Sequence, residues 1–166
     1  MGIPVKVVLY FCLYFLAFGQ SVFTQSSLSA NNQVWTIHID NIKGEKKEIY
    51  CEVAETEEEK RRGLMFRNKL GKDECMIFLY ENPTLLTFWM KNTYIPLSIA
   101  FVNKNHQLTD MFDMKPMDET IISSTTPGIF AIEVNRGWFK KNLVYPGNKI
   151  RITREDLRKK KPETNP

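Results

Sequence analysis

The residues best suited to chemistry form a polar pair, Lys91 and Asn92, which follows the apolar run Phe88–Met90. An ammonium and a carboxamide at the end of a strand can hold an anionic or carbonyl-bearing ligand through charge-assisted hydrogen bonds. We interpret the apolar run, Trp89 included, as core; an exposed Trp89 would instead offer an aromatic face on which a sugar can stack. This stretch therefore predicts a site for a small anionic or carbohydrate-like ligand, or for a partner in the cell envelope.

Three more polar residues fall close to apolar stretches. Arg67 follows a phenylalanine, and Glu133 and Asn135 share one side of a strand because they lie two residues apart. In the competing structural interpretation, Lys91 or Arg67 pairs with Glu133 inside the fold and the asparagines hold turns. A hydrolase that uses Glu133 with Asp110 for glycoside cleavage is a further alternative. The predicted ligand-binding residues are Arg67, Trp89, Lys91, Asn92, Glu133 and Asn135.

The two histidines, His38 and His106, have no Cys, His or carboxylate beside them at a metal-ligand spacing. We place His38 on a strand facing water and His106 at a loop tip. The sequence contains no glycine-rich phosphate loop, and no local motif supports a Cys-His or Ser-His nucleophile. It therefore predicts no metal and no cofactor, and it favours a binding domain over an enzyme or a purely structural module.

A β-rich domain has to position these residues. Alternating or continuous apolar runs predict strands, the first two joined in a hairpin at Asn41–Gly44. Thr56 and Glu59 form a capping box, which predicts a short charged helix over residues 56–63; we assign this helix no chemistry. Many short strands with one or two short helices indicate a mainly β, compact sandwich or barrel-like single domain over residues 34–152. The predicted strands cover residues 34–39, 47–53, 76–80, 85–90, 95–102, 108–114, 129–134 and 149–152, with a helical turn at 138–141.

Four sequence blocks, in this order, resemble a known family. The blocks are Arg62–Arg67, Phe88–Thr93 with Ile95–Leu97, Ile132–Asn135 followed by Gly137, and Pro146–Gly147. On these blocks the chain is identified as a member of the family catalogued as domain of unknown function 192, with the resemblance covering Ile49 to Ile152. The resemblance implies a compact, mainly β fold in a protein that is often bacterial and exported. It implies no activity.

Two cysteines, Cys51 and Cys75, remain if the N-terminal segment is removed. In an oxidising compartment they can form one disulfide. The alternative is two separate buried thiols that behave as small apolar residues. The family usually has glycine where this chain has Cys75, so the resemblance supports a bridge particular to this branch.

The two ends of the chain predict export and a charged tail. Lys6 is the only charged residue before Asp40, and it precedes the apolar run Val7–Phe18, which has the length of a signal-peptide core. Residues 1–19 are therefore interpreted as a signal peptide and residues 20–33 as a flexible spacer. A retained membrane anchor is the alternative. Residues 153–166 are interpreted as a disordered basic tail.

The net charge of +4, from 23 basic and 19 acidic residues, is small and partly confined to residues 154–161. Because this excess of positive charge is small and local, it argues against nucleic-acid binding. We expect an exported, periplasmic or secreted monomer whose partner is a small ligand or an envelope protein. Membrane contact is expected only if the N-terminal segment is retained.

Overall fold

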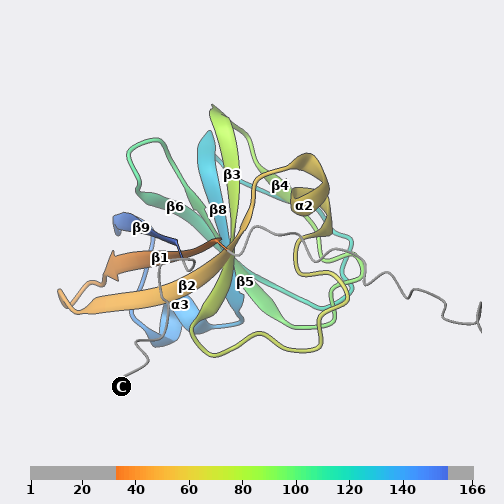
Figure 1. Ribbon diagram of the computed structural model, residues 1–166, viewed down its shortest axis with the longest axis horizontal. Helices are drawn as coiled ribbons and strands as arrows, with labels where there is room; N and C mark the ends of the chain where they lie inside the picture. The colour runs from red at the N-terminus through yellow and green to blue at the C-terminus, as the bar shows by residue number, and fades with distance from the viewer. Residues whose placement is uncertain (1–32, 157–166) are drawn as a thin grey trace, which may run out of the picture. The chain divides into compact units, whose positions relative to one another are not determined.

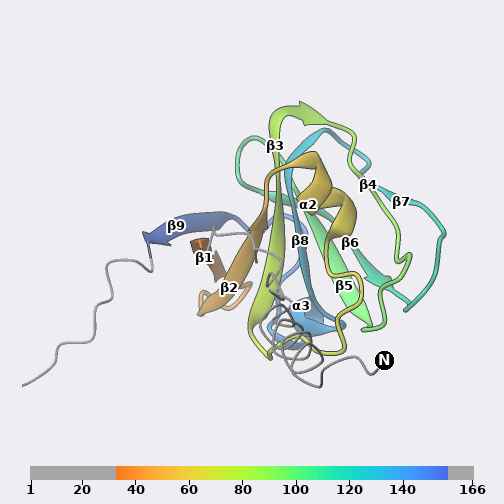
Figure 2. The ribbon, with the colours of Figure 1, turned by 45° about the vertical axis from the view of Figure 1, so that its right-hand side comes forward.

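The computed structural model describes residues 33–156 of the 166-residue chain (Figures 1 and 2). The predicted signal peptide, the spacer up to residue 32 and the tail beyond residue 156 lie outside these residues. The described part is mainly β, as predicted. Its elements are β1 (Gln33–Asp40), β2 (Lys46–Ala54), α2 (Glu57–Arg62), β3 (Glu74–Thr84), β4 (Thr87–Phe88), β5 (Leu97–Val102), β6 (Leu108–Met114), β7 (Ile122–Ser123), β8 (Gly128–Asn135), α3 (Trp138–Lys141) and β9 (Ile150–Asp156).

Seven of the described strands form one sheet in the order β6-β5-β8-β3-β2-β1-β9, and β4 pairs with β7 in a two-stranded sheet. The β2–β3 pair is parallel. A parallel pair needs a crossover connection, which here is the segment that carries α2. The sheet curls toward closure, because Ile150 N donates to His106 O at 2.8 Å and Gly147 N donates to Leu108 O at 2.8 Å. These bonds join the segments leading into the edge strands β6 and β9, giving a half-closed barrel.

The central strands of the sheet are covered on both faces. On β3, Cys75 and Ile77 belong to one apolar cluster, whereas Met76 and Phe78 belong to a second cluster on the opposite face. Successive strand residues point to opposite faces. On β8, Ile132 and Val134 belong to the first cluster, so the intervening Glu133 points toward the second.

Helix α2 has the predicted end signals. Thr56 Oγ1 accepts from Glu59 N at 3.2 Å, and Glu59 Oε2 accepts from Thr56 N at 2.9 Å, which completes the capping box. Gly63, with a φ of 46°, ends the helix. Its N–H donates to Glu59 O at 2.8 Å. The local sequence is sufficient to fix this helix.

The strand predicted over residues 85–90 is mostly wrong, since β4 contains only Thr87 and Phe88. Leu86, Phe88 and Met90 are nevertheless buried at alternate positions. The apolar alternation therefore reports packing against the second cluster rather than a continuous ladder. The partner strand β7 lies outside every predicted strand, and β9 runs four residues beyond the predicted Ile152.

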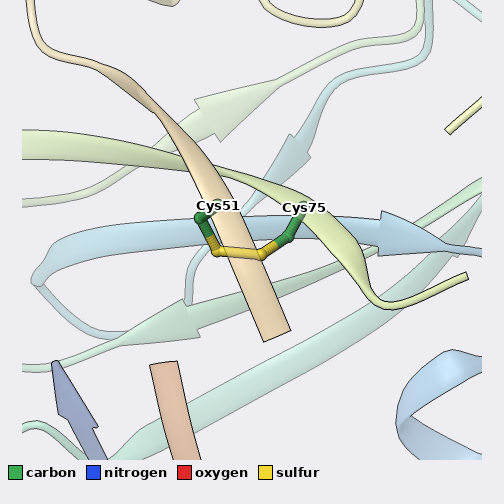
Figure 3. The surroundings of a disulfide bond; sticks show 2 residues. All are labelled: Cys51 and Cys75. Carbon is green, nitrogen blue, oxygen red and sulfur yellow. A yellow bond between two sulfur atoms is a disulfide. The ribbon is translucent and has the colours of Figure 1, made fainter. Parts of the chain in front are cut away.

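Of the two alternatives for the cysteines, the structure contains the disulfide between Cys51 and Cys75 (Figure 3). The two residues are register partners on the parallel strands β2 and β3, with their Cα atoms 4.3 Å apart. Both are buried in the first cluster. The bridge therefore clamps the two ends of the crossover that carries α2.

We expect reduction of the disulfide to lower the free energy of unfolding by about 3 kcal/mol, because the bond restricts the unfolded chain over a sequence separation of 24 residues. Guanidinium unfolding with and without dithiothreitol measures the change. The double variant Cys51→Ala/Cys75→Ala is the control, and its midpoint should not respond to the reductant. An unchanged midpoint of the wild-type protein on reduction would contradict the expectation.

Candidate functional site

A cavity of about 350 Å³ lies between α2, β3, β4 and β8. In Figure 2, α2 stands between β3 and the β4–β7 pair. Apolar side chains from the crossover and the sheet, such as Leu64 and Phe78, form part of the wall. The last turn of α2 and Trp89 also contribute to the lining. The cavity thus lies on the face of the sheet that Glu133 points toward.

Glu133 is the innermost polar residue of this cavity, with only 4% of the residue exposed. Burial, with no opposing charge or hydrogen bond from the described residues, raises the pKa of Glu133 to about 8. The carboxyl is therefore mostly protonated at neutral pH, so it can both donate and accept a hydrogen bond. The carboxyl oxygens open onto the cavity, since Trp35 Nε1 is the one enclosed polar side-chain atom of the described residues without a hydrogen-bond partner. The arrangement leaves this hydrogen-bonding capacity available to a ligand.

The ion pairs to Glu133 that the competing structural interpretation predicts do not form. Arg67 instead makes a two-pronged pair with Glu52 on β2, with Arg67 Nη2 donating to Glu52 Oε2 at 2.6 Å. The hydrogen bond from Arg67 lowers the pKa of Glu52. Lys91 Nζ lies 3.9 Å from Glu119 Oε2. Each cation is paired with an acid other than Glu133, so neither of them forms an ion pair with the Glu133 carboxyl.

Asn135 has a structural role, in line with the interpretation that the asparagines hold turns. Its Nδ2 donates to Gly71 O at 2.7 Å and to Leu70 O at 3.2 Å. These bonds fasten the loop between α2 and β3 to the end of β8. Neither Asn135 nor Arg67 lines the cavity, although both stabilise the segment that does.

Three of the predicted residues, Trp89, Lys91 and Asn92, line a second hollow of about 390 Å³. The interpretation of Trp89 as core is wrong, since it is 42% exposed while Phe88 and Met90 are buried as expected. The alternation that turns its two neighbours inward turns Trp89 outward. Lys91 Nζ lies 5.0 Å from the centroid of the Trp89 ring, which places a cation over an exposed aromatic face.

The backbone at the edge of this hollow is strained. Phe66 and Asn92 have left-handed φ values of 63° and 54°, and Phe66 N donates to Asn92 O at 2.9 Å. Asparagine tolerates this region, but a phenylalanine there is rare and costs on the order of 1–3 kcal/mol. The Phe66 side chain is 57% exposed, with its ring 6.3 Å from that of Tyr94. An exposed aromatic side chain therefore sits on a strained backbone at the edge of the hollow.

The basic last turn of α2 is a part of the site that the sequence analysis missed. Lys60 Nζ lies 2.6 Å from Glu57 Oε1 and 4.6 Å from the centroid of the Tyr80 ring. Arg61 and Arg62 line both hollows and make no ion pair within residues 33–156. The available signal was Arg62, which begins a family block but falls in the charged helix to which the sequence assigns no chemistry.

The carboxylates are arranged differently from the predicted Glu133–Asp110 pair. Asp110 accepts from Thr125 N at 3.0 Å and from Thr125 Oγ1 at 2.8 Å, and it does not line the cavity. The second carboxylate in the cavity lining is Glu57. A hydrogen bond from Lys60 lowers the pKa of Glu57. The cavity thus combines one protonated and one ionised carboxyl.

His38 takes part in a hydrogen-bonded chain across three strands. Its Nδ1 lies 3.0 Å from Glu48 Oε1 and its Nε2 lies 3.1 Å from Thr153 Oγ1. Neither hollow includes these residues, so the chain serves to link β1, β2 and β9. Within residues 33–156 no group of three or more His, Cys, Asp or Glu side chains is placed to hold a metal ion, and none of the described helices is long and apolar enough to cross a bilayer.

Comparison with known protein families assigns this domain to one of them. The sequence pattern of DUF192, described as "Uncharacterized ACR", matches residues 38–152. The chain belongs to the DUF192 family. Both hollows fall inside the matched residues, so the candidate site is a feature of the DUF192 domain itself. No protein with a curated description matches the chain.

Two solved structures are similar to this DUF192 domain. A protein of unknown function from Novosphingobium aromaticivorans DSM 12444 shares 33% identity at a TM-score of 0.70, covering 75% of this chain and 89% of its own. A protein from Sinorhizobium meliloti 1021, described as a candidate transcription regulator, shares 27% identity at a TM-score of 0.69, covering 72% and 92% respectively. Neither description names a ligand.

We expect the free energy of unfolding to fall between about pH 5 and pH 8. Because the pKa of Glu133 is raised, the folded state keeps a proton that the unfolded state releases, so rising pH favours unfolding until the folded pKa of about 8 is passed. The loss amounts to at most about 5 kcal/mol. Urea unfolding at a series of pH values measures it.

The control for this pH dependence is Glu133→Gln, which cannot ionise and should lack the decline. Glu52 and Glu59, whose pKa values are lowered, lose their stabilisation only below their ordinary pKa of 4.5, outside this window. A wild-type profile parallel to that of Glu133→Gln from pH 5 to pH 8 would show that Glu133 is not buried in this way.

Proposed function

We propose that this domain is a ligand-binding module whose cavity beside α2 takes a small carbohydrate-like ligand. The observation that carries the proposal is the Glu133 carboxyl, buried in the cavity wall without a partner among the described residues. A protonated carboxyl matches a sugar hydroxyl, because each group both donates and accepts a hydrogen bond. A ligand hydroxyl in the cavity would hydrogen-bond to this carboxyl, for which no described residue supplies a hydrogen bond.

The rest of the lining suits a sugar ring. Leu64 and Leu86 offer aliphatic contacts for the apolar face of a sugar, and Tyr80 and Trp89 add aromatic rings that each have a lysine ammonium over one face. The cavity volume of about 350 Å³ lies at the lower end of the range for small-molecule sites, roughly 300–1,000 Å³. A single sugar unit is therefore a better match than a large cofactor.

The charges around the cavity favour neutral or anionic ligands. Arg61 and Arg62 line it without ion-pair partners among the described residues, whereas the Glu57 carboxylate is already paired with Lys60. A cationic ligand would meet two free guanidinium groups. This balance supports the class of ligand expected from the sequence, with the site moved from Lys91 and Asn92 to the cavity beside them.

Hydrolysis is a second candidate function, favoured by the two carboxyl groups in the cavity. Burial keeps Glu133 protonated, while the hydrogen bond from Lys60 keeps Glu57 ionised. Pairs of carboxyls with pKa values pushed apart supply the acid and the base of glycoside cleavage. Binding without hydrolysis is our first proposal, because the second carboxylate, Glu57, has 82% of its side chain exposed to solvent.

Export is also part of the proposal. The apolar run Val7–Phe18 behind Lys6 is typical of a signal peptide. The Cys51–Cys75 disulfide supports the same compartment, since such bonds persist in oxidising environments. The module would then meet its ligand in the envelope or outside the cell.

We expect Glu133→Leu to weaken sugar binding at least tenfold, because it removes the hydrogen-bonding group at the innermost point of the cavity. Glu133→Gln, which still donates and accepts, should bind within a few-fold of wild type. Trp89→Ala should weaken binding about tenfold through lost stacking. Thermal-shift screening of neutral hexoses and hexuronic acids, followed by calorimetry, provides the measurement.

Tyr50→Ala is the matched control for Trp89→Ala, since Tyr50 is similarly exposed on β2 but lines neither hollow. Binding that fails for every sugar, while Glu133→Leu simply stabilises the fold, would overturn the proposal. Release of free sugar from a disaccharide, abolished by Glu133→Gln and by Glu57→Gln, would select hydrolysis instead.

We expect the exported form to begin after residue 19. Expression of the whole chain in a bacterial host, fractionation and N-terminal sequencing of the recovered protein test this. Recovery of the intact N-terminus from the membrane fraction would instead establish the retained anchor.

A further inference from the structure

Resting on the proposed function, we propose that the second hollow is a further subsite, so that the ligand is an anionic oligosaccharide of at least two units. One unit occupies the Glu133 cavity and the next lies across the hollow lined by Phe66, Lys91 and Asn92. The domain therefore recognises part of an acidic glycan chain rather than a free monosaccharide.

The two hollows adjoin and share four lining residues. Arg61, Arg62, Met65 and Trp89 line both of them. A ligand that fills the first hollow therefore ends against residues that also face the second. Such adjoining subsites with a common aromatic and cationic wall suit a polymer of similar units.

The charge of the second hollow selects an anionic chain. Arg61, Arg62 and Lys91 line it against a single carboxylate, Glu58. Both arginines lack ion-pair partners among residues 33–156, and Lys91 Nζ is 3.9 Å from Glu119 Oε2, a long and exposed pair. Guanidinium groups bind carboxylates through two parallel hydrogen bonds, so the uronate groups of an acidic glycan fit these side chains.

Exposed aromatic rings favour a glycan over other anionic chains. Phe66 is 57% exposed and Trp89 is 42% exposed, and both line the second hollow. Flat aromatic faces at the surface bury the apolar faces of sugar rings at low entropic cost, because these side chains have few rotatable bonds. The left-handed backbone of Phe66 directs its side chain toward the surface beside Trp89 and Lys91.

Calorimetry with galacturonic acid, its dimer and its trimer tests the inference. We expect the dimer to bind the wild-type protein about tenfold more tightly than the monomer, with the gain falling as salt is added. Arg61→Gln/Arg62→Gln should abolish that gain. Arg151→Gln is the matched control, since Arg151 lies on β9, which contributes to neither hollow. Melting temperatures of both variants verify that the fold is intact.

Lys91→Gln supplies a second variant on the far side of the hollow and should reduce the affinity for the dimer but not for the monomer. Equal affinities for monomer, dimer and trimer would overturn the inference while leaving the Glu133 site intact. A triglutamate peptide that binds more tightly than the trimer would overturn the choice of a glycan. A wild-type protein that binds none of these compounds, yet binds neutral hexoses in a Glu133-dependent way, would overturn the inference but not the proposed function.

Discussion

Coverage of the central strands on both faces is the constraint on which the rest of this domain depends. Strands β3 and β8 carry apolar side chains toward two separate clusters. One cluster fills the curl of the sheet, and the other needs a cover from outside the sheet. The crossover with α2 and the segments around β4 and β7 supply this cover. The cavity lies under that cover, between the irregular segments and the outer face of the curled sheet.

Glu133 is the one ionisable residue among the buried residues of the described chain. An apolar side chain at this position would pack with Phe78 and Phe88 and avoid the cost of a buried carboxyl. Glu133 therefore lowers the stability of the fold relative to an apolar residue, but it supplies a hydrogen-bonding group inside an apolar wall. Such a trade is typical of binding and catalytic sites. The protonated Glu133 leaves the interior of the site neutral, whereas Arg61 and Arg62 make its edge cationic.

The cover is fixed to the sheet at several points, which makes the cavity a preformed site. The Cys51–Cys75 bond clamps the crossover at its ends, the Arg67–Glu52 pair ties its middle to β2, and Asn135 holds the loop before β3. A site supported in this way loses little conformational entropy when a ligand binds. The two predicted site residues that do not line a hollow, Arg67 and Asn135, thus hold the residues that do.

Local chemistry in the sequence was enough to predict the strands β1, β2, β5, β6 and β8, the capped helix α2 and the turn at α3, because alternation, capping and turn residues act over a few positions. The family blocks and the candidate roles of Lys91, Asn92 and Glu133 were also visible there. Which groups pair was not, since Arg67 with Glu52 and Asn135 with Gly71 are brought together by strand register and by the crossover. The outward turn of Trp89, and the placement of α2 beside Glu133, likewise follow from burial of both faces of the sheet. That is a property of the assembled layers, which no single stretch of sequence contains.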